Sequence, residues 1–263
     1  MNPFYFGSSR EALYGVYNPA RARSGEPVGA VLCYPMGSEY MRSHRAFRQL
    51  TNLLTRAGVH VLRFDYFGTG DSAGDEEQSS VERWLIDVEH AIDELKDTAG
   101  LKSVRLVGLR FGGTLACLVA SRRQDVERAA LWDPVVRGEN YLQELLTYAE
   151  LPAIAQGRPG AWPSGTVGVG GFPLTDALRA EIAAIDLGRL AQRPAGRLDF
   201  IASAERAEDI SCHETWQSAG MSVRYRCIPS EGNWAEGDEF GSALIPQEII
   251  QGVVQSITEE VSS

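Results

Sequence analysis

The chain has 263 residues, enough for one large α/β domain with a sizeable core or for two small domains, and its 44% hydrophobic and 23% charged residues are ordinary for a soluble globule. Its formal net charge of −10 argues against a broad nucleic-acid-binding surface. The sequence has no apolar run near the roughly 20 residues of a membrane span, and no N-terminal pattern of a signal peptide. We therefore expect a cytoplasmic protein without a membrane span or a nucleic-acid partner.

Strand and helix patterns alternate along the chain. Short apolar runs predict strands, and apolar residues three and four positions apart predict helices. Ser79 and Glu82 have the spacing of a capping box before one of these helices. The fold class is therefore α/β, a mostly parallel sheet flanked by helices with an antiparallel start. The predicted strands are residues 4–6, 12–17, 28–34, 59–66, 104–109, 129–133, 198–203 and 223–228, and the predicted helices include residues 42–57, 79–97, 141–149, 176–185, 212–219 and 247–261.

Residues 104–116 predict a buried strand, a sharp turn and a helix rich in small residues. This is the setting of a nucleophile elbow, where G-x-S-x-G presents a nucleophile above the carboxyl end of a parallel sheet. Gly108 and Gly112 occupy positions where a Cβ would clash with the neighbouring strand and helix. The middle position is Arg110, and a protonated guanidinium has no lone pair with which to attack a carbonyl carbon. The stretch predicts an elbow without its usual nucleophile.

A second stretch, Gly70-Asp71-Ser72-Ala73-Gly74, also matches G-x-S-x-G. The acidic run of residues 75–78 follows it, whereas the motif requires a strand, a turn and an apolar helix in succession. We therefore interpret Ser72 as a loop residue.

Residues 137–194 interrupt the alternation of strands and helices. Two helical patterns flank a stretch rich in glycine and proline between Gly157 and Pro173. This composition is typical of an inserted lid. We expect a single domain over residues 1–263, with a helical lid inserted at about residues 139–195.

The alternating elements, the glycine elbow and the loop after Asp65 together resemble the α/β-hydrolase superfamily. Several stretches resemble more specifically the branch known as exosortase A system-associated hydrolases, type 2. The resemblance covers roughly residues 28–250 and implies an α/β-hydrolase fold, while the branch name records gene neighbourhood and implies little about substrate. The stretches are Gly108-Leu109-Arg110, Leu131-Trp132-Asp133-Pro134-Val135 with Gly138, Gly171-Phe172-Pro173-Leu174-Thr175 and Asn233-Trp234.

In the superfamily, the catalytic residues follow the order nucleophile, acid, histidine. The acid normally follows the strand predicted at residues 198–203, and some members use an acid one strand earlier. No histidine occurs after His213, so the loop after the last strand cannot supply the third member. With Arg110 at the elbow, we do not expect the usual serine-hydrolase mechanism. The available acids are Glu205, Glu208 and Asp209, or Asp133 in the earlier position.

The remaining candidate groups have simpler structural interpretations. Buried free cysteine usually packs as a small hydrophobe, and a serine needs an activating base. The four cysteines lack any C-x-x-C pair, which indicates free thiols, no metal site and no cofactor. We considered His44, His60, His90 and His213 as structural or surface histidines, with His44 and His213 on the side of the site, and we considered Cys33, Ser38 and Ser43 as unsupported nucleophiles.

Arg110 has two compatible interpretations. It is a structural cation paired with Asp133, Glu39 or Glu205, or it binds a ligand at the carboxyl edge of the sheet, where open parallel sheets bind ligands. Asn233 and Trp234 either pack within their own loop or form an aromatic wall of the same pocket. We assign Arg110, Asp133 and Glu205 to catalysis, and Glu39, Phe111, Met36, Trp234 and Asn233 to substrate binding.

Two classes of function remain open. In the first, the chain is an enzyme of altered chemistry, such as a non-serine hydrolase, acyl transferase, lyase or cyclase, acting on a small acyl- or carboxylate-bearing molecule. Arg110 would then stabilise a developing negative charge. In the second, it is a catalytically inactive relative that binds a small ligand or a protein. The composition also leaves a homodimer open.

Overall fold

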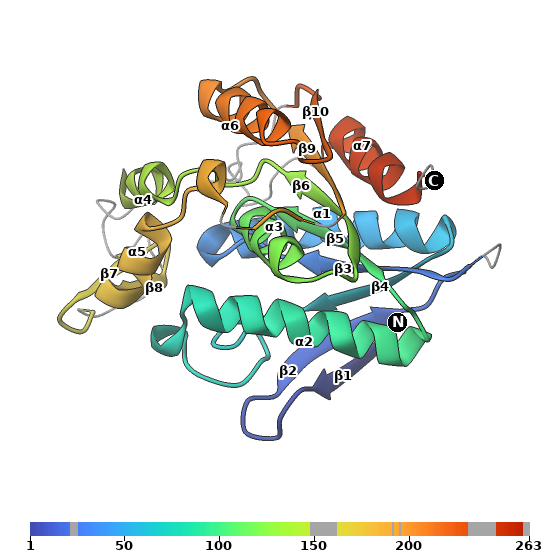
Figure 1. Ribbon diagram of the computed structural model, residues 1–263. Coiled ribbons are helices and arrows are strands. Elements are labelled where there is room, and N and C mark those ends of the chain that lie inside the picture. The colour runs from blue at the N-terminus through green and yellow to red at the C-terminus, as the bar shows by residue number, and fades with distance from the viewer. Residues whose placement is uncertain (22–25, 148–161, 191, 195, 231–245, 260–263) are drawn as a thin grey trace.

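The computed structural model describes residues 1–21, 26–147, 162–190, 192–194, 196–230 and 246–259. Its centre is one eight-stranded sheet of order β1-β2-β4-β3-β5-β6-β9-β10 (Figure 1). Neighbouring strands are parallel from β4 to β10 and antiparallel at β1 and β2, which confirms the predicted fold class. The strands of this sheet are β1 (Asn2–Phe6), β2 (Leu13–Asn18), β3 (Val28–Cys33), β4 (Val59–Phe64), β5 (Val104–Leu109), β6 (Val126–Trp132), β9 (Arg197–Ala202) and β10 (Val223–Cys227).

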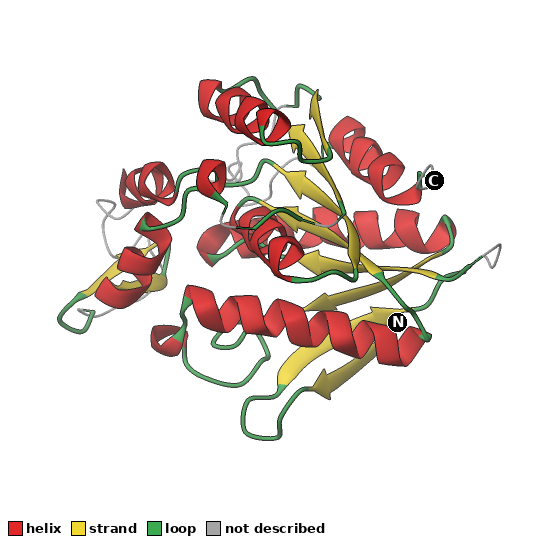
Figure 2. Cartoon of the chain, viewed as in Figure 1, coloured by secondary structure: helices red, strands yellow, loops and turns green. Residues whose placement is uncertain are grey.

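Helices cover both faces of the sheet (Figure 2). α1 and α7 pack together on one face, and α2 and α3 pack together on the other. Within the described ranges, no helix combines the length and the apolar character needed to cross a membrane. The helices are α1 (Gly37–Arg56), α2 (Val81–Ala99), α3 (Phe111–Arg122), α4 (Gly138–Thr147), α5 (Asp176–Ala183), α6 (Ala207–Ser218) and α7 (Gln247–Thr258), with short 3-10 helices η1 (Glu76–Gln78) and η2 (Leu187–Arg189).

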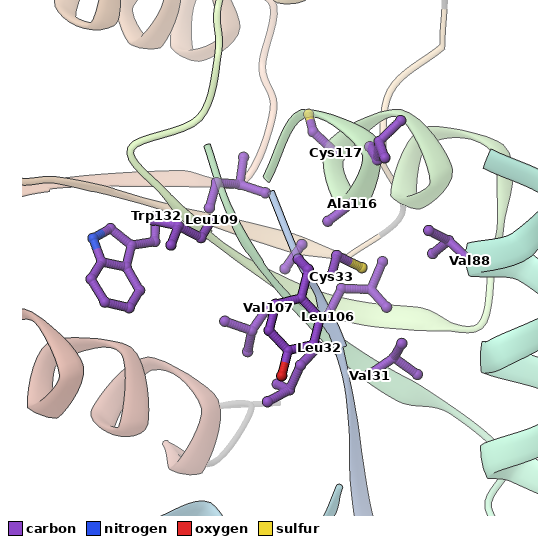
Figure 3. Packing of buried hydrophobic residues seen from close by; sticks show 14 of the residues in the cluster. Val31, Leu32, Cys33, Val88, Leu106, Val107, Leu109, Ala116, Cys117 and Trp132 are labelled. Atoms are coloured by element: carbon purple, nitrogen blue, oxygen red, sulfur yellow. The ribbon is translucent and has the colours of Figure 1, made fainter. Parts of the chain in front are cut away.

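The core lies on both sides of the two central strands, β3 and β5. Val31, Leu32 and Leu106 are fully buried, because strands covered by helices on both faces have no side that meets solvent. Figure 3 shows these side chains packed with Val88 of α2 and Ala116 of α3. The burial of β5 on both faces fixes the position of the turn that follows it.

Four predicted helix starts differ from the structure: α4 begins at Gly138 rather than at residue 141, α6 begins at Ala207 rather than at residue 212, and the starts of α1 and α2 also differ. Ser80, not Ser79, caps α2, because the Ser80 hydroxyl accepts a hydrogen bond from the Arg83 backbone N–H at 3.2 Å. Ser79 instead ends η1. α1 begins at Gly37 rather than at residue 42, and this places Glu39 in its first turn, where the helix dipole favours a negative charge.

The insertion between β6 and β9 contains α4, α5 and a two-stranded hairpin that the sequence analysis missed. Strands β7 (Thr166–Val169) and β8 (Phe172–Thr175) pair antiparallel around Gly170 and Gly171. Both glycines have positive φ, 57° and 92°, which a tight two-residue hairpin turn requires. A Gly-Gly pair between apolar runs is a signal of such a hairpin. The described insertion is therefore a mixture of helix and hairpin rather than purely helical.

Candidate functional site

The turn between β5 and α3 has the tight packing of a nucleophile elbow. A Cβ on Gly108 would lie 2.2 Å from the Gly112 carbonyl oxygen, and a Cβ on Gly112 would lie 2.3 Å from the Cys33 carbonyl oxygen. Arg110 stands between them with φ 52° and ψ −122°, a backbone region that non-glycine residues rarely adopt. The two glycines let α3 approach β3 and β5 closely, and the strained residue between them projects over the carboxyl edge of the sheet.

The Arg110 side chain is buried in an ion-pair network. Its Nε donates to Glu39 Oε1 at 2.9 Å, and its Nη2 donates to both carboxylate oxygens of Glu144 at 2.7 Å. The Tyr141 hydroxyl donates to the second oxygen of Glu39 at 2.9 Å. The guanidinium carbon also lies 5.3 Å from the centre of the Tyr141 ring. Glu39 is thus shared between Arg110 and Tyr141, which joins the elbow to α1 and α4.

The charges in this network favour a permanently protonated Arg110. Burial lowers the pKa of the guanidinium, but Glu39, Tyr141 and Glu144 more than reverse this effect and raise it above its ordinary value. Burial, together with Glu39, raises the pKa of the Tyr141 hydroxyl well above its ordinary value, so this hydroxyl remains a donor. The side chain of Arg110 can therefore bind and stabilise negative charge, and it cannot act as a nucleophile or a base.

Phe111 packs against the Tyr141 ring of this network. It is fully buried, stacks on the Tyr141 ring with centroids 5.8 Å apart, and meets the edge of Trp84. We expected Phe111 to contact substrate, and the structure places it fully buried between these two rings.

Asp133 and Asp209 form a second buried charged group beside the elbow. Asp133 follows β6 with φ 44°, and its Oδ1 accepts a hydrogen bond from the Ser203 backbone N–H at 2.7 Å. Arg206 Nη1 lies 3.5 Å from Asp133 Oδ1 and 3.7 Å from Asp209 Oδ2. Neither oxygen of Asp209 nor Oδ2 of Asp133 has a hydrogen-bond partner among the described residues. Burial raises the pKa of Asp209 to about 7, so this carboxyl exchanges a proton near neutral pH.

The structure therefore changes the predicted partners of Arg110. Of the three carboxylates considered, only Glu39 contacts it among the described residues. Asp133 is turned toward Ser203 and Arg206 instead. Glu205 is exposed in the loop between β9 and α6, and no ion pair joins it to Arg110. Asn233 and Trp234 lie outside the described residues.

Glu144, Tyr141 and Arg206 are the site residues that sequence reasoning missed. Tyr141 and Glu144 are three positions apart and so lie on one face of α4. The available signal in the sequence was therefore a glutamate that shares a helix face with a tyrosine. Arg206 lies three positions before its partner Asp209, but its other partner, Asp133, follows the distant strand β6, so the local sequence did not mark it as a site residue.

Two pockets flank the network and share no lining residue. A mainly apolar pocket of about 460 Å³ lies beside the first turns of α1 and includes Met36, Tyr40, His44, Trp84 and Phe172. A polar pocket of about 270 Å³ lies between the loop after β6 and the starts of α4 and α6, and Arg110 lines it. Met36 lines the apolar pocket. Burial lowers the pKa of His44, which favours a neutral ring at pH 7.

The other candidate nucleophiles and bases lie elsewhere. The Ser72 hydroxyl donates to the Asp65 backbone carbonyl and accepts from the Tyr14 backbone N–H, so it fastens the loop after β4. Burial raises the pKa of Cys33 to about 12, which leaves it as a protonated thiol. The described residues hold no group of three or more His, Cys, Asp or Glu side chains placed to bind a metal ion. His60 lies beside Tyr17, His90 lies on α2, and the His213 ring packs against Tyr225.

The sheet order, the glycine-packed elbow and the polar site at the carboxyl edge define an α/β-hydrolase fold. The family model Hydrolase_4, described as serine aminopeptidase, S33, matches residues 30–183, and the chain belongs to this family of α/β hydrolases. No curated protein sequence matches the chain.

Solved structures share the fold along nearly the whole chain. Est1E from Butyrivibrio proteoclasticus, determined with ferulic acid bound, has a TM-score of 0.67 at 15% identity and covers 97% of this chain and 96% of its own. The Pyrococcus furiosus esterase PF2001 has a TM-score of 0.63 at 14% identity, covering 87% of this chain and 81% of its own. Alpha/beta hydrolase domain-containing protein 10 from mouse has a TM-score of 0.56 at 17% identity, covering 98% and 97%. At these identities the likeness establishes the fold.

Proposed function

We propose that this member of the α/β-hydrolase family works without a nucleophile at the elbow, and that Arg110 is the electrostatic centre of its site. One observation carries the proposal: Arg110 occupies the strained central position between β5 and α3, with its guanidinium anchored by Glu39 and Glu144. A fixed cation at this position stabilises an anionic group or a developing negative charge without forming a covalent intermediate.

The proposed substrate is a small molecule that carries an acyl or anionic group. The apolar pocket beside Met36 and Trp84 suits an acyl chain or an aromatic ring, and Arg110 lines the neighbouring polar pocket. Burial raises the pKa of Asp209 to about 7, and Arg206, which lines the polar pocket, lies 3.7 Å from its carboxylate, so Asp209 is the proposed proton donor or acceptor beside this pocket. These parts fit hydrolysis without a serine, acyl transfer, or a lyase or cyclisation step that relies on positioning and electrostatics.

Labelling with a fluorophosphonate probe tests the loss of serine chemistry. The wild-type protein should remain unlabelled at probe concentrations that saturate an active serine hydrolase, since no hydroxyl at the elbow is available for phosphonylation. Stoichiometric labelling that mass spectrometry maps to Ser72, Ser38 or Ser43 would show that the active site lies elsewhere.

A second candidate is a binding protein without catalytic activity. It is favoured by the pairing of Arg110 with two carboxylates, because the charge available for catalysis is already compensated within the protein. Arg110→Met separates the two functions. An enzyme loses turnover with this change, whereas a binding module shows no turnover against acyl esters, thioesters or lactones before or after it.

The finer assignments extend the same proposal. We propose that the chain belongs with the exosortase A system-associated hydrolases, type 2, a proposal supported by the resemblance of the motifs around Arg110, Trp132 and Gly171. We propose that the insertion serves as a lid, which is supported by the contacts of Tyr141 and Glu144 of α4 with the site at the elbow. We propose a cytoplasmic location for the protein.

A further inference from the structure

The polar pocket beside Arg110 has more hydrogen-bond donors than its own residues use. Arg110 donates from Nε and Nη2, and its Nη1 makes no hydrogen bond to a described residue. Arg110 is mostly buried and lines the pocket, which leaves this nitrogen as the end of the fork available to a ligand. A planar guanidinium with one free nitrogen suits an oxygen acceptor.

Arg137 supplies a second unused guanidinium on the wall of the pocket. It is exposed and lines the cavity, and its side chain forms no hydrogen bond or ion pair with the described residues. Its backbone is held firmly, by a bridge to Asp186 and by the hydrogen bond from the Gly138 N–H to the Ile185 carbonyl oxygen at 2.9 Å. The backbone of Arg137 is therefore fixed, while its guanidinium group is available to a ligand.

Three of the four carboxylate oxygens that line the pocket already accept a hydrogen bond. Both oxygens of Glu144 accept from Arg110, and Glu208 accepts from the Asn140 amide at 2.7 Å. Arg206, the third guanidinium of the wall, lies within 4 Å of two buried carboxylates, Asp133 and Asp209. A ligand in this pocket gains most by bringing acceptors, which favours an anion over an ammonium group.

The surrounding charge limits how negative that ligand is. Glu39, Asp133, Asp209, Glu144 and Glu208 lie in or behind the wall, against the guanidiniums of Arg110, Arg137 and Arg206. A dianion such as phosphate would meet this excess of carboxylates, whereas a single carboxylate can pair with the two unused guanidinium ends. The volume of about 270 Å³ accommodates a small organic group.

We infer that this pocket binds the carboxylate of a small monocarboxylic acid between Nη1 of Arg110 and the guanidinium of Arg137. The inference deepens the proposed function, on which it rests, by naming the anionic group that meets Arg110. Arg137 is then a specificity residue, since it touches the ligand and has no structural partner to lose.

Titration of the full chain with sodium propionate, followed by heteronuclear NMR, tests the site. We expect saturable shifts at the backbone amides of residues 135–140. Arg137→Ala should weaken propionate at least about tenfold, the loss of one hydrogen bond to a charged group, and Arg137→Lys should recover part of the affinity. Arg189→Ala is the matched control, because Arg189 lies in the same insertion with its side chain 87% exposed and outside the pocket lining. Inorganic phosphate and methylammonium chloride should compete poorly.

Three results would overturn the carboxylate site: no saturable shift with propionate, unchanged affinity in Arg137→Ala, or tighter binding of phosphate or methylammonium. Fluorophosphonate labelling of the wild-type protein tests the proposed function separately. A protein that binds propionate through Arg137 and is also labelled at a serine would retain this site and refute the nucleophile-free mechanism.

Discussion

Glu39 Oε1 accepts a hydrogen bond from Arg110 Nε at 2.9 Å, although the two residues are 71 positions apart in the sequence. Their side chains are only 2% and 9% exposed, so each neutralises a charge that the core could not otherwise hold. The pair joins the first turn of α1 to the elbow, and Tyr141 and Glu144 extend the link to α4. What occupies the centre of the site is an assembled ion-pair network.

Removal of the guanidinium should destabilise the fold as well as the site. We expect Arg110→Ala to cost about 3–5 kcal/mol of unfolding free energy, because it leaves Glu39 buried without its cation. Arg110→Lys should cost less, since a lysine keeps the charge but loses the fork. Adding Glu39→Gln to Arg110→Met should recover much of the loss. Urea unfolding gives the free energy of unfolding of the wild type and of each variant. An Arg110→Ala variant as stable as the wild type would contradict a structural role for the pair.

The elbow glycines provide a steric prediction with a matched control. Gly112→Ala should destabilise the protein by about 3 kcal/mol or more, because the added Cβ would lie 2.3 Å from two backbone carbonyl oxygens. Gly100→Ala places the same methyl group where no atom lies within 4 Å, at a φ of 66°. It should cost only the left-handed backbone penalty of about 1–2 kcal/mol. Equal losses in thermal unfolding would show that the elbow can relax.

The raised pKa of Asp209 predicts that the free energy of unfolding depends on pH. Its folded-state pKa of about 7 lies above the ordinary value of 3.8, so it contributes stability that is fully present below about pH 4 and is lost as the pH rises through 7. Between these values the wild type should lose up to about 1.4 kcal/mol per pH unit relative to Asp209→Asn. Denaturant unfolding of both proteins from pH 4 to 8 gives this difference directly. A constant difference over that range would place the folded pKa of Asp209 near its unfolded value.

The hairpin of β7 and β8 should open more easily than the main sheet. A two-stranded ribbon separate from the central sheet has few backbone partners, whereas β5 has a neighbour on each side and is buried on both faces. We therefore expect faster amide hydrogen exchange in residues 166–175 than in residues 104–109. Equal protection would mean that the hairpin unfolds only with the whole domain.

Much of the fold could be predicted because its signals are local. The glycines at 108 and 112 and the apolar runs of β3 and β5 predicted the elbow and the central strands. The start of α2 was misplaced by one residue because Ser79 and Ser80 have the same side chain, and the choice between them depends on the end of η1. The hairpin was missed although Gly170 and Gly171 carried its signal.

The candidate site was harder to predict because its contacts join distant segments. Arg110 could be recognised as unusual from the elbow motif alone. Its partner Glu144 could not be chosen over Asp133 or Glu205, because only the docking of α4 brings that carboxylate to Nη2. Asp133 turns toward Ser203 because β6 and β9 are neighbours, a fact of strand order rather than of local sequence.

The most direct test of the central claim is fluorophosphonate labelling of Arg110→Ser, which rebuilds the elbow motif as Gly-Leu-Ser-Phe-Gly. We predict a folded variant that remains unlabelled and gives no acyl-enzyme burst with a p-nitrophenyl ester. Arg110 is held by Glu39 and Glu144, and Glu39 by Tyr141, so among the described residues this network contains no histidine to take the proton of the new hydroxyl. Rapid stoichiometric labelling at residue 110 would show that the site keeps a working base, and it would contradict the account.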